Sequence, residues 1–228
     1  LTSVLDGTLA AGINNALSSG AVTVNGGIYN IDGFSDSVGT VTLTDGSILG
    51  TTGVLSGSSF AVQNGLITAI LGGAGNLAKT TAGTVTLSGL NTYTGSTTLS
   101  AGTLIVNVLA NGGVASSIGA ASTSSANLVF SGGTLEYTGA STSTNRNYVL
   151  TTATTNTFNI TDNAANLTFA GASTNTSGAL TKMGDGTLTL AGANLYTGLT
   201  TVNAGVLAEG VNNALSSGAV TISGGTFD

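Results

Sequence analysis

Internal repetition is the feature of this sequence that most constrains its fold. Residues 77–104 read LAKTTAGTVTLSGLNTYTGSTTLSAGTL, and residues 180–207 return the pattern, 103 residues further on, as LTKMGDGTLTLAGANLYTGLTTVNAGVL. A second register links the two ends, because the segment 7–27 reappears with few changes at 205–225. Self-similarity of this kind is typical of solenoids, in which each unit buries its apolar face against the next.

Within each copy, apolar and polar residues alternate over short segments. Val85 and Leu87 fall on one side of an extended chain, and Thr84 and Thr86 fall on the other. The same alternation recurs at Val22 and Val24, Val41 and Leu43, Leu128 and Phe130, Phe158 and Ile160, Leu167 and Phe169, Leu188 and Leu190, and Val220 and Ile222. These segments predict short strands, each with one buried face.

Glycine and proline content indicates how these strands are connected. The 36 glycines and the absence of proline disfavour long helices, since an interior glycine costs a helix about 1 kcal/mol relative to alanine. The strands lie too close together for crossover helices, and Asn25-Gly26, Asp45-Gly46 and Asn64-Gly65 suit hairpin turns or solenoid corners equally well. We therefore predict an all-β fold, a right-handed parallel β-helix (β-solenoid) of roughly ten coils, about 50 Å long at about 4.8 Å per coil.

The repeats also suggest how the chain is organised. We expect residues 1–228 to form a single continuous solenoid segment, with repeat units at 1–30 (partial), 77–107 and 180–228. The opening segment reads as the continuation of a repeat whose first half is missing, so we expect a fragment of a longer repetitive protein, with any export signal outside it. Because neither end carries an obvious polar cap, end-to-end stacking of subunits into filaments is the alternative expectation.

Charge and residue types exclude several functions. Charged residues make up 5% of the chain, the formal net charge is −6, and the basic residues are Lys79, Arg146 and Lys182, so we expect no nucleic acid partner. No apolar run reaches the roughly 18 residues that span a bilayer as a helix, so we expect no membrane insertion by this segment. The absence of His and Cys removes the Ser-His-Asp and Cys-His nucleophiles and the usual zinc ligands, and no cofactor or metal is predicted.

Carboxylates are the remaining candidates for catalysis or calcium binding. Among the nine acidic residues, Asp32 and Asp36 are the pair that most resembles the two carboxylates of a glycosidase, although turn formation is the simpler interpretation. The segment 72–76 lacks the aspartate of the calcium-binding glycine-rich repeat. Asp185 stands where the other copy has Ala82, which favours a solvated corner over a ligand.

Several polar residues recur at equivalent positions of the two copies. Lys79 and Lys182 are interpreted as exposed residues that lead into a strand, where a charge discourages edge pairing. The residues to which we assign a structural role in the repeat are Lys79, Val85, Leu87, Asn91, Tyr93, Gly95, Lys182, Leu188, Leu190, Asn194, Tyr196 and Gly198.

The recurring tyrosines allow two interpretations. Tyr93 and Tyr196 could stack on a sugar, but a half-buried ring that covers a turn is the simpler interpretation. Asn91 and Asn194 would then form hydrogen bonds with the backbone of the corner.

Paired threonines raise the possibility of ice binding, since a flat threonine array can match an ice lattice. The pairs are Thr40 and Thr42, Thr84 and Thr86, and Thr187 and Thr189. They recur at 103 residues and not in every coil, so we expect no continuous flat array.

The unit K-x-x-x-G-T-[VL]-T-L-[SA]-G-x-N-x-Y-T-G-x-T-T-[LV]-x-A-G-[TV]-L, present at 79–104 and 182–207, resembles the passenger-associated transport repeat of bacterial autotransporters. The resemblance implies a β-helical passenger segment on the cell surface, often a stalk in adhesins, whose folding outside the cell assists export across the outer membrane. The family's signal sequence and translocator barrel are absent from these residues, which predicts a passenger fragment.

The leading hypothesis is a structural or adhesive extracellular segment, a stalk or fibre of a large secreted bacterial surface protein, and not an enzyme. A carbohydrate-active β-helix would need two carboxylates on one face within about 10 Å, and an ice- or surface-binding solenoid would need a flat, continuous threonine face. The expected partners are neighbouring solenoid repeats or subunits, end to end, and a host or abiotic surface.

Overall fold

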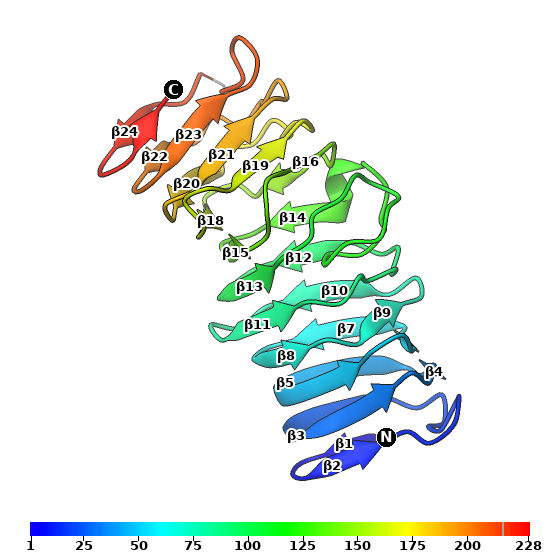
Figure 1. Ribbon diagram of the computed structural model, residues 1–228. Coiled ribbons are helices and arrows are strands. Elements are labelled where there is room, and N and C mark those ends of the chain that lie inside the picture. Colours follow the sequence, from blue (N-terminus) through cyan, green and yellow to red (C-terminus); the bar gives the residue numbers. More distant parts are fainter. Residues whose placement is uncertain (216) are drawn as a thin grey trace.

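The chain folds into a parallel β-solenoid. The computed structural model describes residues 1–215 and 217–228, which form an all-β solenoid of about 11 turns with parallel strands (Figure 1). The fold class predicted from the alternating pattern is confirmed. Ser216, within the predicted repeat unit 180–228, lies outside the described residues. In the described part of the chain, no helix is long and apolar enough to cross a membrane.

The strands of successive coils stack into three faces. The first face contains β1 (Thr2–Val4), β7 (Ser59–Val62), β10 (Asn76–Lys79), β12 (Thr97–Leu99), β14 (Leu128–Phe130) and β17 (Val149–Leu150), with the first halves of β3 (Val22–Asp32) and β5 (Thr40–Gly50). The second face contains β2 (Thr8–Ala10), β8 (Gly65–Ile67), β11 (Thr84–Leu87), β13 (Thr103–Val106), β15 (Thr134–Tyr137), β18 (Thr155–Ile160), β20 (Ala179–Met183), β22 (Thr200–Val202) and β24 (Val220–Ile222), with the second halves of β3 and β5. The third face contains β4 (Asp36–Ser37), β6 (Val54–Ser56) and β9 (Ile70–Gly72), and later β16 (Thr142–Thr144), β19 (Asn166–Phe169), β21 (Thr187–Leu190), β23 (Val206–Glu209) and β25 (Thr226–Phe227). A short 3-10 turn, η1 (Ser125–Asn127), precedes β14.

The Asn-Gly and Asp-Gly pairs form corners between the first two faces. Asn25 pairs with Asp45 in the next coil, and Nδ2 of Asn64 donates to Oδ1 of Asp45 at 2.8 Å. Gly46 has a φ of 97°, and a Cβ there would lie 2.2 Å from the carbonyl oxygen of Gly27. Only glycine tolerates both conditions. These pairs therefore stack as successive corners, and none of them makes a hairpin.

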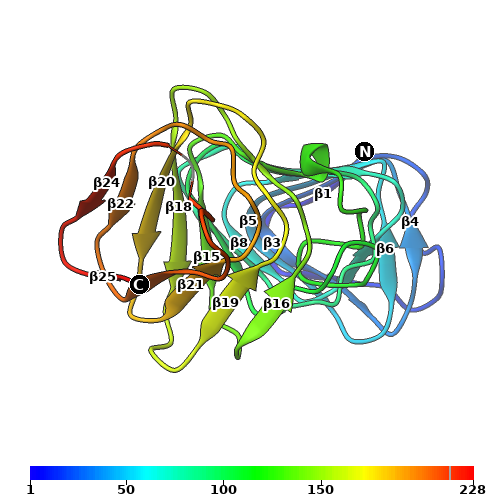
Figure 2. The same cartoon turned by 90° about the horizontal axis from the view of Figure 1, so that it is seen from above.

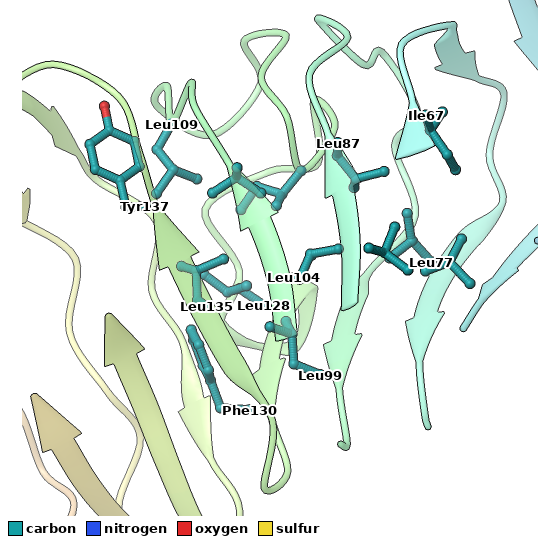
Figure 3. Packing of buried hydrophobic residues seen from close by; sticks show 14 of the residues in the cluster. Ile67, Leu77, Leu87, Leu99, Leu104, Leu109, Leu128, Phe130, Leu135 and Tyr137 are labelled. Atoms are coloured by element: carbon teal, nitrogen blue, oxygen red, sulfur yellow. The ribbon is translucent and has the colours of Figure 1, made fainter. Parts of the chain in front are cut away.

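Inward side chains from all three faces form one continuous apolar core. Figure 3 shows part of this column, in which Leu104 and Leu135 occupy paired positions of neighbouring coils and are fully buried. Burial of one such leucine contributes about 1.5–3 kcal/mol. Because successive coils add inward residues to the same column, each coil between the two terminal coils is stabilised by the coils on both sides.

The two copies of the repeat occupy different positions around the solenoid. The second face runs from β11 through β13, β15 and β18 to β20. However, β20 is the counterpart of β10, which lies on the first face. The second copy is therefore turned by one face relative to the first, and Figure 2 shows the C-terminal coils displaced to one side of the N-terminal coils.

Aromatic side chains fill the core where this change occurs. The rings of Phe130 and Phe158 have centroids 4.6 Å apart, and those of Tyr148 and Phe169 are 5.3 Å apart. The four residues come from all three faces, and each is almost completely buried. Their volume suits the longer coils of this region, which aliphatic side chains would fill less well.

Candidate functional site

The lysines of the repeat lie inside the solenoid, so the prediction that they are exposed is wrong. Lys79 and Lys182 both have 0% exposed surface. Nζ of Lys182 donates to the carbonyl oxygens of Met183 and Gly184, both at 2.8 Å, and to that of Ala204 in the next coil at 3.2 Å. The physical reason is the period-two pattern, which points the lysine inward with Leu180 and lets its aliphatic stem pack in the core.

Lys79 forms the matching arrangement in the first copy. Its Nζ donates to the carbonyl oxygen of Thr81 and, at 3.2 Å, to that of Ala101 in the next coil. Burial lowers the pKa of Lys79. Burial also lowers the pKa of Lys182 to about 8, and the nearby carboxylate of Asp185 opposes that shift. Asp185 itself is exposed in the corner, as predicted. Each lysine thus joins two coils by capping corner carbonyls.

The recurring asparagines connect three coils. Oδ1 of Asn91 accepts from the backbone N–H of Leu71 at 2.8 Å, in the preceding coil, and its Nδ2 donates to the carbonyl oxygen of Ser117 at 2.7 Å, in the following coil. Its side chain is fully buried. Leu71 belongs to β9, whose last pairing within the three-stranded sheet is with β6. The Asn91 amide therefore replaces a strand partner at the end of that sheet.

Asn194 repeats this function with more hydrogen bonds. Its Oδ1 accepts from the N–H of Ser173 at 2.7 Å and from the hydroxyl of Tyr148 at 2.8 Å. Its Nδ2 donates to the carbonyl oxygens of Gly192 at 3.0 Å and Ala214 at 2.8 Å. Because all these groups are buried or lie beside buried backbone, water offers no easy substitute for the amide.

The repeat tyrosines are core residues, and the prediction of a half-buried ring is also wrong. Tyr93 is 0% exposed and Tyr196 is 1% exposed. Each hydroxyl lies 2.7 Å from the hydroxyl of the threonine four residues later, Thr97 and Thr200. Burial raises the pKa of Tyr93, and it raises the pKa of Tyr196 to about 12. Neither ring is available to stack on a sugar.

The remaining repeat residues shape the coil. Val85, Leu87, Leu188 and Leu190 are fully buried in the apolar column. Gly95 and Gly198 lie where successive coils approach most closely: a Cβ would stand 2.3 Å from the carbonyl oxygen of Gly75 at Gly95, and 2.2 Å from that of Gly178 at Gly198. Any larger residue would push two coils apart at these points.

Arg146 is a buried residue to which the sequence analysis assigned no role. It is 2% exposed, and it extends into the loop that joins β13 to β14. Its Nε donates to the carbonyl oxygen of Ala110 at 3.0 Å, Nη1 to that of Ala121 at 3.1 Å, and Nη2 to that of Gly119 at 2.8 Å. Further contacts of Nη2 are with Asn111, Val114 and Ser116.

The guanidinium thus organises the longest coil of the solenoid. Burial lowers the pKa of Arg146, but arginine stays charged in proteins, so the loop carbonyls compensate for its lost hydration. Thr144, Arg146, Tyr148 and Leu150 are all buried. This period-two run is the signal that could have placed Arg146 inside. All three cationic side chains of the chain are therefore interior.

The candidate carboxylate pair does not converge. Asp36 is buried, where its Oδ2 accepts from the Tyr29 hydroxyl at 2.5 Å and from the N–H of Leu17 at 3.2 Å. Asp32 is exposed in a left-handed turn with a φ of 46°, and its Oδ1 accepts from the hydroxyl of Thr51 at 3.2 Å. Asp32 thus fits the turn interpretation, whereas Asp36 is an interior acceptor.

Residues 1–215 and 217–228 also lack two other features of a reactive centre. Within these ranges there is no group of three or more metal-ligating Asp or Glu side chains. No enclosed pocket is found in the same part of the chain.

One outer row of the second face is an unbroken column of threonines. The seven residues of this threonine ladder, one in each of seven consecutive coils, are Thr84, Thr103, Thr134, Thr157, Thr181, Thr201 and Thr221. The ladder passes from the first copy of the repeat into the second because the second copy is turned by one face.

The ladder is a single row and not a flat two-dimensional array. The next outward position along the same strands holds Ile105, Glu136, Asn159 and Met183 in successive coils. These side chains differ in size and charge. A lattice of regularly spaced hydroxyls, as ice binding requires, is therefore not formed on this face.

Comparisons with known proteins agree with this architecture. The Passenger-associated-transport-repeat family matches the chain at residues 77–106 and 180–208; the partial unit at 1–30 stays a prediction. The chain is 42% identical over 204 residues to the Adhesin BmaC autotransporter of Brucella suis biovar 1 (strain 1330), across 88% of this chain and 6% of that protein. The chain thus spans about 6% of the length of this relative. No solved structure matches the chain.

Proposed function

Because this chain is a segment of an autotransporter passenger domain that carries passenger-associated transport repeats, we propose that it serves as a stiff extracellular spacer whose outer faces contribute to adhesion. The spacer would belong to a large secreted bacterial surface protein. The observation that carries the proposal is the set of repeat side chains that join the coils of each repeat to the neighbouring coils along a continuous core.

Stiffness follows from these connections. A solenoid bends or unravels where the contacts between two coils are weakest. In both repeats the lysine ammonium and the asparagine amide bond to carbonyls of the following coil, and the asparagine also accepts an N–H of the preceding coil. The repeats therefore reinforce the coil boundaries at intervals along the rod.

A role without catalysis fits the distribution of reactive groups. The sequence has no His or Cys, and the three basic side chains are buried with carbonyl partners. The candidate acids Asp32 and Asp36 point to different environments. A spacer needs none of these groups at its surface, whereas a glycosidase needs two convergent carboxylates.

Adhesion is proposed from the name of the relative and from the character of the outer faces. The relative is an adhesin, and it is many times longer than this chain, which favours a place in an extended surface structure. Adjacent solenoid coils and a host or abiotic surface are the partners that we propose. Threonine, serine and asparagine side chains give these faces many hydrogen-bonding groups and few charges.

The proposal is tested by coating beads with this chain and counting the beads that attach to cultured epithelial cells and to glass. Attachment above that of beads coated with an unrelated acidic protein is expected. The control is the same chain after heat denaturation, which should lose attachment. If beads that carry the folded chain attach no better than the controls, the adhesive part of the proposal is refuted.

A further inference from the structure

We propose that the threonine ladder binds an uncharged, extended, β-linked polysaccharide laid along the solenoid axis. The proposal rests on the proposed adhesive function and names the class of ligand. It depends on three properties of the ladder: the lack of hydrogen-bond partners for its hydroxyls, the spacing of these hydroxyls, and the charge around them.

The ladder hydroxyls have no hydrogen-bond partner among the described residues, although many other threonines do. Oγ1 of Thr144 donates to Ala110, that of Thr189 to Asn166, and that of Thr154 to Thr151. Such bonds are absent for all seven ladder residues within the described ranges. Hydroxyls that point outward from a strand and lack an internal partner are free for a ligand.

Thr181, in the middle of the ladder, adds an independent observation. It is only 9% exposed, yet its hydroxyl makes no hydrogen bond to any residue that the structure describes. A buried hydroxyl without a hydrogen-bond partner lowers the stability of the folded state by about 1–3 kcal/mol relative to one that is hydrogen-bonded. Thr181 lies in register between Thr157 and Thr201, so a ligand laid along this row would supply the missing hydrogen-bond partner.

The spacing of the ladder fits a polymer with a short repeat. Neighbouring parallel strands lie about 4.8 Å apart, so the ladder offers one hydroxyl and one methyl group at that interval. A β-linked glycan in its extended form repeats its sugar ring at nearly the same interval. Each threonine hydroxyl can donate and accept, and each methyl can contact the C–H groups of a ring. Several weak contacts on one chain then act together.

Charge selects an uncharged polymer over an anionic one. All three cationic side chains are buried, and Glu136 lies two residues beyond Thr134 on the outer side of β15. Its carboxylate is held by Nδ2 of Asn159 at 2.9 Å. A sulfated or uronic acid polymer would meet this negative charge without a basic residue to offset it.

The test is isothermal titration calorimetry of the full chain with cellohexaose, an extended β-linked oligomer, and with maltohexaose, its coiled α-linked counterpart. The ladder variant carries Thr134→Val and Thr157→Val, which remove two hydroxyls but keep the shape and strand preference of the side chains. The matched control carries Thr23→Val and Thr42→Val, an in-register outward pair on the first face. Circular dichroism must show that both variants keep the wild-type spectrum.

We expect cellohexaose to bind, maltohexaose to bind more weakly, and the ladder variant to bind cellohexaose on the order of tenfold more weakly than wild type. The control variant should bind like wild type. The proposal is overturned if cellohexaose does not bind, if both oligomers bind equally, or if the two variants lose affinity equally. The bead assay distinguishes failure of this proposal from failure of the adhesive function. If beads that carry the ladder variant still attach, the segment adheres, but the threonine ladder is not the part that adheres.

Discussion

Substitution of Asn194 by alanine tests the role of the repeat asparagine in joining coils. The change removes a buried amide that makes four hydrogen bonds. Two donors then lose their partner, the backbone N–H of Ser173 and the hydroxyl of Tyr148, whereas the carbonyl oxygen of Ala214 keeps the N–H of residue 194 at 3.2 Å.

The size of the effect follows from these two donors. Each buried donor left unpaired costs about 1–3 kcal/mol, so Asn194→Ala should lower the free energy of unfolding by about 4 kcal/mol. This is a large part of the roughly 5–15 kcal/mol that stabilises a typical domain. The neighbouring substitution Leu195→Ala is the control, because Leu195 is 56% exposed and a surface change of this kind shifts stability by less than about 0.5 kcal/mol.

Two assays report on the change. Urea unfolding followed by circular dichroism gives the free energy difference for each variant. Hydrogen exchange of the Ser173 amide reports the lost bond directly, and its protection should fall in Asn194→Ala but not in Leu195→Ala. If Asn194→Ala unfolds within about 0.5 kcal/mol of wild type and the Ser173 amide stays protected, Asn194 does not join the coils in this way.

Three further predictions concern the interior charges and the core. Replacement of Arg146 by methionine should lower the free energy of unfolding by about 3 kcal/mol and make the 107–127 loop sensitive to protease, and a loop that resists cleavage equally in both proteins would contradict its proposed role. For Lys182, the folded pKa of about 8 lies below the ordinary lysine pKa of 10.5, so between these pH values the unfolded chain holds a proton that the folded chain has released. The stability of wild type relative to Lys182→Met should therefore rise as the pH increases from about 8 to 10.5, and a difference that is constant with pH in urea titrations would argue against a buried amine. In the secreted protein, Leu87→Asp combined with Leu190→Asp places two charges in the core and should slow appearance at the cell surface, measured by antibody labelling of intact cells; unchanged export would count against stepwise coil formation as a driving force.

Much of the fold could be predicted because strand alternation and repetition are local properties of the sequence. The pattern at 84–87 correctly placed Val85 and Leu87 in the core. The same pattern also pointed Lys79 inward with Leu77, but its charge was taken as a sign of exposure. A long aliphatic stem and two carbonyl acceptors at the corner, those of Thr81 and Ala101, make the interior position possible, and such acceptors are visible only when neighbouring coils are assembled.

Neither the threonine ladder nor the rotation of the second repeat by one face could be predicted from the sequence, because coil lengths vary. From Thr84 to Thr103 the coil spans 19 residues, whereas from Thr103 to Thr134 it spans 31. Threonines that are neighbours in space therefore have no constant spacing along the chain. The longer coil depends on Arg146, a distant residue whose contacts with the loop could not be inferred from composition or period.

Distance measurements between spin labels test most directly the claim that all coils stack in register into one rod. The chain has no cysteine, so pairs introduced at outward positions of the first face, Thr23 with Thr98, Val129 or Val149, are the only labelling sites. These positions lie four, five and six coils apart in the paired register. Stacking in register predicts that the distance grows by about 4.8 Å per coil, whether the added coil is short or contains the 107–127 loop. Distances that follow sequence separation, or that shrink between successive pairs as in antiparallel layers, would contradict it.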